Sequence, residues 1–160
     1  MILIFITVGT QKFQFNRLLK EIDELCSTGV IKEKVIAQVG YSTYVPTHFE
    51  VHKLLKPEEM DNYVENASLL ISHGGTSSIF NGLKKKKKVI VIPRLKQFDE
   101  HVDDHQIEIC NVLDKKGYVS VVWDIKKLGE EISDIHSETF NTYSFSEGEL
   151  VNDIIKFISK

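Results

Sequence analysis

Four short apolar runs constrain the fold of this 160-residue chain more than any other feature. The runs are Ile2–Val8, Val35–Val39, Ala67–Ile71 and Val89–Ile92. A strand with one face in water alternates apolar and polar residues, whereas a continuously apolar strand is covered on both faces. Stretches with helical spacing of apolar residues separate the runs, so the pattern predicts an α/β fold with a doubly wound, mostly parallel sheet.

The remaining segments continue this alternation of strands and helices. Apolar spacing predicts a helix that begins near Phe15, and Pro57 with two acids after it opens a helix that runs to about Asn66. Ile79–Leu83 opens the next helix, and His101–Lys116 forms another that Gly117 closes. Short strands are predicted near residues 49–51 and over 118–122, which brings the number of strands to six. Two helices end the chain, and the last one carries Leu150, Val151, Ile154, Ile155 and Ile158 on one face. This spacing favours packing on the core over docking to a partner.

Composition excludes several classes of protein. With 42% hydrophobic residues, residues 1–160 are expected to form a single domain, and a net charge of −3 argues against a nucleic-acid binder. The two cysteines, Cys26 and Cys110, lie in predicted helices and are expected to be reduced thiols of a cytoplasmic protein. The apolar start of the chain has no basic segment before it, and no run reaches the roughly 20 apolar residues of a membrane span.

The segment Ser72–Ser78 contains the strongest candidate for a binding site. Paired glycines between a strand and a helix allow close approach of a ligand to backbone N–H groups, and a helix N-terminus favours an anion. Hydroxyls follow at Thr76, Ser77 and Ser78, and His73 stands at the mouth. The alternative is an ordinary strand-to-helix turn in which His73 is structural.

Ligands of doubly wound sheets bind beyond the carboxyl ends of the strands. Three predicted loops lie at that edge, namely residues 7–11, the His73 segment and residues 93–106. The third is rich in groups that suit sugar hydroxyls, including Asp103, Asp104, His105 and Gln106. Its acids and histidines do not follow a metal-loop pattern, so we expect a solvated helix start and no metal site.

Four motifs in this order resemble one family: Ile4–Thr10, Gln38–Gly40, Ser72–Thr76 and Asp103–Gln106. The chain resembles the catalytic subunit of the split, two-chain GT-B glycosyltransferases of glycosyltransferase family 28. Eukaryotic members of this group add the second N-acetylglucosamine to dolichol diphosphate, and similar bacterial members act in exopolysaccharide and capsule synthesis. The resemblance covers nearly the whole chain and implies the Rossmann-like C-terminal half of a GT-B enzyme.

The resemblance also implies roles for individual residues. It places the diphosphate of a UDP-sugar donor among Gly9, Thr10, Gly74, Gly75 and Thr76. The sugar hydroxyls would contact Gln106, with Asp103, Asp104 and His105 beside it. Asn81 stands where relatives carry an acid that holds the ribose, and this departure weakens the expectation for that contact. His73 is the expected catalytic residue.

The family implies an inverting transfer to a lipid-linked sugar acceptor, without a cofactor or metal. The other half of the cleft would come from a membrane-anchored partner subunit, which would hold this chain at the cytoplasmic face of the membrane. Alone, the chain would be nearly inactive. A non-catalytic sugar-nucleotide-binding regulatory module is the alternative, and a small protein that binds another phosphorylated ligand, such as a flavin nucleotide, is the third.

A run of five lysines, residues 84–88, follows the glycine-rich segment. Lysines can bind anionic lipid or the diphosphate of an acceptor. They also complement the dipole at the end of a helix. The run lies at the far end of its predicted helix from His73, which favours the second interpretation.

Overall fold

The computed structural model describes residues 2–144 and contains one six-stranded sheet in the order β3-β2-β1-β4-β5-β6. Every neighbouring pair of strands is parallel. The strands are β1 (Leu3–Thr7), β2 (Lys34–Gln38), β3 (Glu50–His52), β4 (Leu69–His73), β5 (Lys88–Ile92) and β6 (Ser120–Val121). The helices are α1 (Asn16–Ser27), α2 (Pro57–Asn66), α3 (Thr76–Lys84), α4 (His105–Lys115) and α5 (Leu128–Asp134), with short 3-10 turns at Lys96–Phe98, Ile125–Lys127 and Ile135–Ser137.

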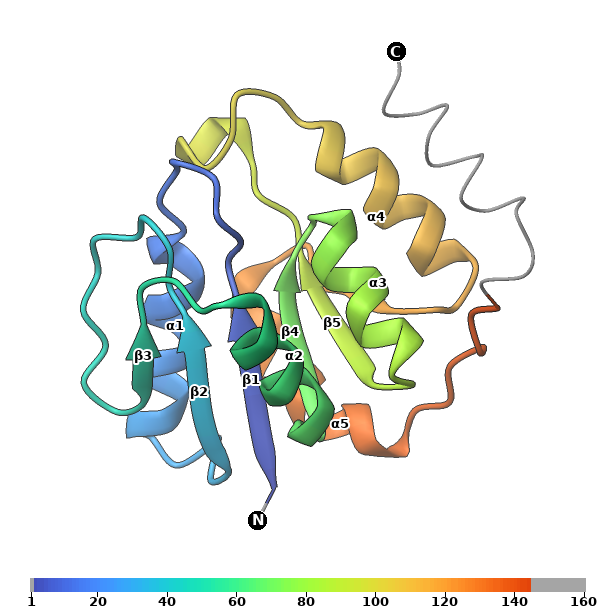
Figure 1. Cartoon of the computed structure of the whole chain (residues 1–160), viewed down its shortest axis with the longest axis horizontal. Helices are drawn as coiled ribbons and strands as arrows, with labels where there is room; N and C mark the ends of the chain where they lie inside the picture. The colour runs from blue at the N-terminus through green and yellow to red at the C-terminus, as the bar shows by residue number, and fades with distance from the viewer. Residues whose placement is uncertain (1, 145–160) are drawn as a thin grey trace.

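The helices cover both faces of the sheet, as Figure 1 shows. Helices α2, α3 and α4 lie on the face toward the viewer, and α1 and α5 lie behind it. Side chains of β1 alternate between the two cores: Ile4 and Ile6 pack with α1 and α5, whereas Phe5 packs with α2, α3 and α4. Both faces of the central strands are therefore buried from solvent, which explains their apolar runs. The predicted doubly wound parallel sheet is confirmed.

The position of β1 creates the crevice where a ligand can enter. The chain passes from β1 to β2 on one side and later returns to place β4 on the other side. Connections that leave in opposite directions open a gap above the carboxyl ends of these strands. The register sets Thr7 opposite Gln38 on one side and opposite Ser72 on the other. Polar residues at the ends of three neighbouring strands thus lie side by side at this gap.

Several element boundaries differ from the predictions, and three of them lie near the site. Strand β4 continues to His73, two residues beyond the apolar run, and α3 already begins at Thr76, so the connection is shorter than predicted. Helix α4 begins at His105 rather than His101. Asp99 adopts a left-handed conformation with φ of 55°, and Asp103 Oδ1 accepts the N–H of His105, which holds the preceding residues outside the helix.

Other predictions concern the cysteines and the chain's relation to a membrane. Cys26 and Cys110 are both free, and burial raises the pKa of their thiols to about 11 and about 12. Neither thiol forms a reactive thiolate at neutral pH. Among residues 2–144, no helix has the length and apolar character needed to cross a bilayer. The final predicted helix, with Leu150 and its neighbours, lies outside the described residues.

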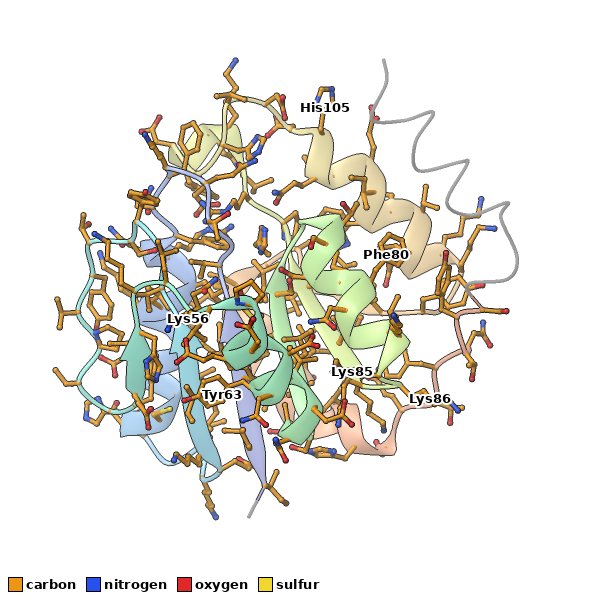
Figure 2. The ribbon with its side chains drawn as sticks, in the orientation of Figure 1. Lys56, Tyr63, Phe80, Lys85, Lys86 and His105 are labelled. Carbon is orange, nitrogen blue, oxygen red and sulfur yellow. The ribbon has the colours of Figure 1, made fainter. Side chains whose placement is uncertain are left out.

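The lysine run is tied into the fold. Lys85 pairs with Glu65 of α2 at 3.0 Å, and Lys88 Nζ donates to the carbonyls of Ile135, His136 and Glu138 at 2.8–2.9 Å. Lys85 and Lys86 lie at the end of α3 that is remote from the carboxyl edge of the sheet (Figure 2). These contacts favour the structural interpretation of the run.

Lys86 itself adopts a left-handed backbone conformation, with φ of 57°, directly after α3. A side chain in this conformation carries steric strain that glycine lacks. We therefore expect Lys86→Gly to raise the free energy of unfolding by about 0.5–1 kcal/mol, measured by urea denaturation. Lys84→Gly, at the last residue of α3, is the matched control and should lower the free energy of unfolding by up to about 1 kcal/mol. A loss of stability in Lys86→Gly would contradict the strain argument.

Candidate functional site

A cavity of about 470 Å³ lies above the carboxyl ends of β1, β2 and β4, between α2 and α3. Loop β1–α1 and the start of α3 give it polar walls, and the start of α2 gives it an apolar wall. Its lining residues are Thr7, Gly9, Thr10, Gln11, Gln38, Leu55, Pro57, Met60, Val64, His73, Gly75, Thr76, Ser77, Ser78 and Asn81. Six of the predicted site residues therefore share this cavity: Gly9, Thr10, His73, Gly75, Thr76 and Asn81.

Two buried polar side chains form the floor. Gln38 Nε2 donates to Thr7 Oγ1 at 3.3 Å, and Thr7 Oγ1 also accepts the N–H of Gly9 at 3.3 Å. On the other side, Gln38 Oε1 accepts the N–H of Leu55 at 2.8 Å. This chain of hydrogen bonds links the loop before α1 to the loop before α2, so the two walls keep a fixed separation.

His73 is buried, with 8% of its surface exposed. Its Nδ1 lies 3.4 Å from the carbonyl of Thr7, which can only accept, so Nδ1 carries the proton and Nε2 presents a lone pair. Burial is the main cause that lowers the pKa of His73 to about 4, and the nearby positive charge of Arg94 adds to it. The ring is therefore neutral at pH 7.

Two glycines enclose Nε2 of this ring. A Cβ atom at Gly9 would lie 2.6 Å from Nε2, and one at Gly75 would lie 2.2 Å from it. Gly9 also has φ of 80°, a conformation that glycine adopts without strain. Both positions therefore require glycine while His73 keeps this orientation.

Helix α3 presents its N-terminus to the cavity. The first N–H groups of a helix have no partner within it. Those of Thr76, Ser77 and Ser78 make no hydrogen bond to any residue between 2 and 144, and their side chains line the cavity. Asn81 follows on the second turn of the helix and lines the same space. Positive potential and free donors suit an anion at this point.

Gln106 and Gly74 have a different arrangement from the predicted one. Buried Gln106 uses Oε1 to accept the N–H of Gly74 at 3.1 Å and that of Arg94 at 2.9 Å. The N–H of Gly74 is thus occupied within the protein rather than open to a ligand. The carbonyl oxygen of Gln106 is likewise engaged, which leaves its Nε2 as the group that can reach outward.

Asp103, Asp104 and His105 do not line the cavity. Asp103 lies between two imidazoles, 3.1 Å from His101 Nδ1 and 3.0 Å from His105 Nδ1. The backbone N–H of His105 is the main cause that lowers the pKa of Asp103. Asp104 accepts the N–H of Lys96 at 3.0 Å, and His105 projects from the start of α4 away from the sheet (Figure 2). Within the described chain, no group of three or more histidine, cysteine or acidic side chains has an arrangement that could hold a metal ion.

Several residues of this site had no individual role assigned from the sequence, although Thr7 and Gln38 lie in the predicted loop of residues 7–11 and the Gln38–Gly40 motif. Thr7 and Gln38 end apolar strands, and their position at a strand end is the signal that identifies them as floor residues. Leu55 and Met60 form the apolar wall, but apolar residues at the start of a helix predict core packing equally well. Arg94 lies in a loop, where no periodic pattern of residues indicates that its side chain is buried.

Residues 3–156 match the family model described as "Glycosyltransferase family 28 C-terminal domain". The chain belongs to glycosyltransferase family 28. This confirms the family expected from the four motifs.

Relatives in family 28 include proteins named "UDP-N-acetylglucosamine transferase subunit ALG13". The one from Candida albicans is 27% identical over 113 residues, which are 71% of this chain and 37% of that protein. The human one is 27% identical over 125 residues, which are 72% of this chain and 10% of that protein. The chain thus spans about a third or less of these relatives.

Solved structures share the fold. A solution structure of ALG13 has a TM-score of 0.62 at 19% identity and covers 96% of both chains. The glycosyltransferase of kitacinnamycin has a TM-score of 0.65 at 15% identity and covers 99% of this chain but 39% of its own. MurG of Acinetobacter baumannii has a TM-score of 0.60 at 15% identity, with coverages of 98% and 45%. The expected GT-B C-terminal type of fold is confirmed.

Proposed function

We propose that the chain is the donor-binding catalytic subunit of an inverting glycosyltransferase. It would move a sugar from a UDP-sugar to a polyprenyl-diphosphate-linked saccharide in exopolysaccharide, capsule or glycolipid synthesis. The observation that carries this proposal is the cavity between α2 and α3, in a member of family 28. In this cavity a helix N-terminus with free N–H groups faces an apolar wall.

The chemistry of the walls suits the parts of a UDP-sugar. Leu55, Pro57 and Met60 offer apolar surface to a uracil ring, and Asn81 offers an amide to the ribose. The free N–H groups at the start of α3 and the glycine at position 9 offer donors and close approach to a diphosphate. We propose that Gln106 Nε2 contacts the sugar. The residues before it, Asp103, Asp104 and His105, lie outside the cavity and would be within reach only of a part of the substrate that extends beyond it.

The bond to be broken explains why these donors matter. Departure of UDP develops negative charge on the diphosphate, and donors already oriented toward it stabilise that charge. Negative charge beside His73 also raises the proton affinity of Nε2, so the ring can acquire a proton there and donate to a leaving oxygen. Inversion requires a base on the opposite face of the sugar, which we assign to the partner.

A partner would also supply the acceptor half of the cleft. The relatives in Candida albicans and human are named as transferase subunits, and this chain aligns with only 39% of a one-chain glycosyltransferase. We propose a membrane-anchored partner subunit that binds the lipid-linked acceptor and holds this chain at the cytoplasmic face of the membrane. The isolated chain would then bind donor but transfer little sugar.

Calorimetric titration with UDP and a panel of UDP-sugars, in the presence of EDTA, tests the donor site. We expect binding that His73→Ala weakens and that EDTA leaves unchanged. Addition of the co-expressed partner and a lipid-linked acceptor should then give sugar transfer. Binding without transfer in this complex would favour a non-catalytic module, and no binding even in the complex would refute the proposal.

A further inference from the structure

Arg94 lies two residues after the end of β5 and has the largest fully buried side chain of the described residues, with 1% exposed. Its Nη1 donates to the backbone carbonyls of Phe13, Gln14 and Glu100 at 3.1, 3.2 and 3.0 Å. Its Nη2 donates to the carbonyl of Val8. Three of these four carbonyls belong to the connection between β1 and α1, which carries the cavity residues Gly9, Thr10 and Gln11.

The partners of this buried cation are unusual. Buried charges are normally paired with an opposite charge. In the part of the chain that the structure describes, no carboxylate lies within ion-pair distance of Arg94, and its Nε has no hydrogen-bond partner. Backbone carbonyls and the ring of Phe15, 5.1 Å from the guanidinium carbon, surround it instead. Burial lowers its pKa to about 10, so it stays charged at neutral pH.

The carboxylate of Glu100 makes a separate set of contacts near Arg94, and these contacts do not take over the bonds that Arg94 makes. The fully buried carboxylate of Glu100 accepts from Arg17 Nε at 2.9 Å, Arg17 Nη2 at 3.0 Å and the N–H of Leu95 at 3.0 Å. These bonds join α1 to the loop between β5 and α4. They do not reach the β1–α1 connection beside the cavity.

Backbone contacts extend the same network to the third loop. The N–H of Arg94 and the N–H of Gly74 share one acceptor, Gln106 Oε1. Arg94 is therefore joined through its side chain to the β1–α1 connection and through its backbone to the β4–α3 connection. Loops of this kind have few hydrogen bonds of their own, so outside contacts determine their position.

We propose that Arg94 is a positioning residue that fixes the β1–α1 connection, so that Gly9 and Thr10 keep the geometry needed to bind the donor. It does not line the cavity, and it acts through the carbonyls of Val8, Phe13 and Gln14. The choice of UDP as the ligand in the test rests on the proposed function. The expected effect of Arg94 on the position of the β1–α1 connection is independent of that function.

Arg94→Met removes all the side-chain hydrogen bonds to these carbonyls and keeps an unbranched apolar side chain. We expect UDP affinity to fall about tenfold or more, because small displacements of binding groups have large effects. Hydrogen exchange of the amides between residues 8 and 15 should be faster. Arg17→Met is the matched control: it removes a cation from the same cluster and its contact with the Phe15 ring at 5.5 Å, but no hydrogen bond to the β1–α1 connection. It should lower thermal stability while UDP affinity stays within about twofold.

Arg94→Lys provides the test if the methionine variant does not fold. It keeps the positive charge but not the planar fork that reaches several carbonyls at once, so it should also lose affinity and loop protection. Unchanged exchange of residues 8–15 in a folded Arg94 variant would overturn the proposal. Faster exchange with unchanged UDP affinity would overturn it too. If the wild type does not bind UDP even with its partner, the proposed function fails, and hydrogen exchange alone then decides the role of Arg94.

Discussion

Gly75→Ala should abolish donor binding while the protein remains folded. The backbone at Gly75 has φ of −79° and ψ of 129°, a conformation open to any residue, so the substitution brings no local strain. Its Cβ would, however, lie 2.2 Å from Nε2 of His73. Either the imidazole or the start of α3 must move by more than an ångström. We expect UDP affinity to fall about a hundredfold or more, equivalent to about 2.7 kcal/mol, as measured by calorimetry.

A double variant separates this clash from other causes. His73→Ala removes the ring that the new methyl group would meet. Gly75→Ala combined with His73→Ala should therefore bind UDP as well as His73→Ala alone. Gly29→Ala is the control for the glycine itself, because Gly29 has φ of 76° and nothing within 4 Å of an added Cβ. It should cost about 1 kcal/mol of stability and leave binding unchanged. If the double variant binds no better than Gly75→Ala, the steric explanation is wrong.

Mild acid should destabilise the protein through His73. The pKa of this residue is about 4 in the folded protein, against an ordinary value of 6.5. Above pH 6.5 both states hold a neutral ring. As the pH falls from 6.5 toward 4, the unfolded chain gains a proton that the folded protein does not, so unfolding becomes more favourable. The shift corresponds to a loss of about 3 kcal/mol over this range.

Urea denaturation between pH 7 and about pH 4 in the absence of ligand measures this loss. His73→Asn keeps a donor toward the carbonyl of Thr7 but does not titrate, so its stability should depend less on pH by about the same 3 kcal/mol. His136→Gln removes an exposed histidine and is the control for the loss of an imidazole as such. Parallel curves for the wild type and His73→Asn would contradict the assignment of the effect to His73.

The sequence predicted the sheet well because each central strand is covered on both faces. Ile4, Phe5 and Ile6 must all be apolar in such a strand, and this leaves a clear signal. The ends of the elements left a weaker signal in the sequence. His73 is polar yet ends β4, because a strand can carry its last residue into a functional cavity after the apolar run has stopped.

The supporting contacts of the site were beyond prediction. Gln106 lies within the helix predicted over residues 101–116 and in the first turn of α4. Neither its residue type nor its spacing indicates that its side-chain carbonyl accepts the N–H of Gly74, 32 residues earlier. Arg94 reaches Val8 across 86 residues. Such contacts depend on how three loops come together in space. Sequence patterns describe one element at a time, so the residues in the loops were identified while their partners were not.

The order of the strands has a consequence for how the chain folds. Strand β1 lies at the centre of the sheet, and its pairing with β4 joins Ile4 to Leu69. Parallel pairing between segments this far apart forms slowly, because a long loop must close before the contact stabilises it. During synthesis, one edge of the largely apolar strand β1 therefore has no partner until β4 has emerged from the ribosome. We expect nascent chains that end before His73 to depend on chaperones, and chains that include β5 to lose this dependence.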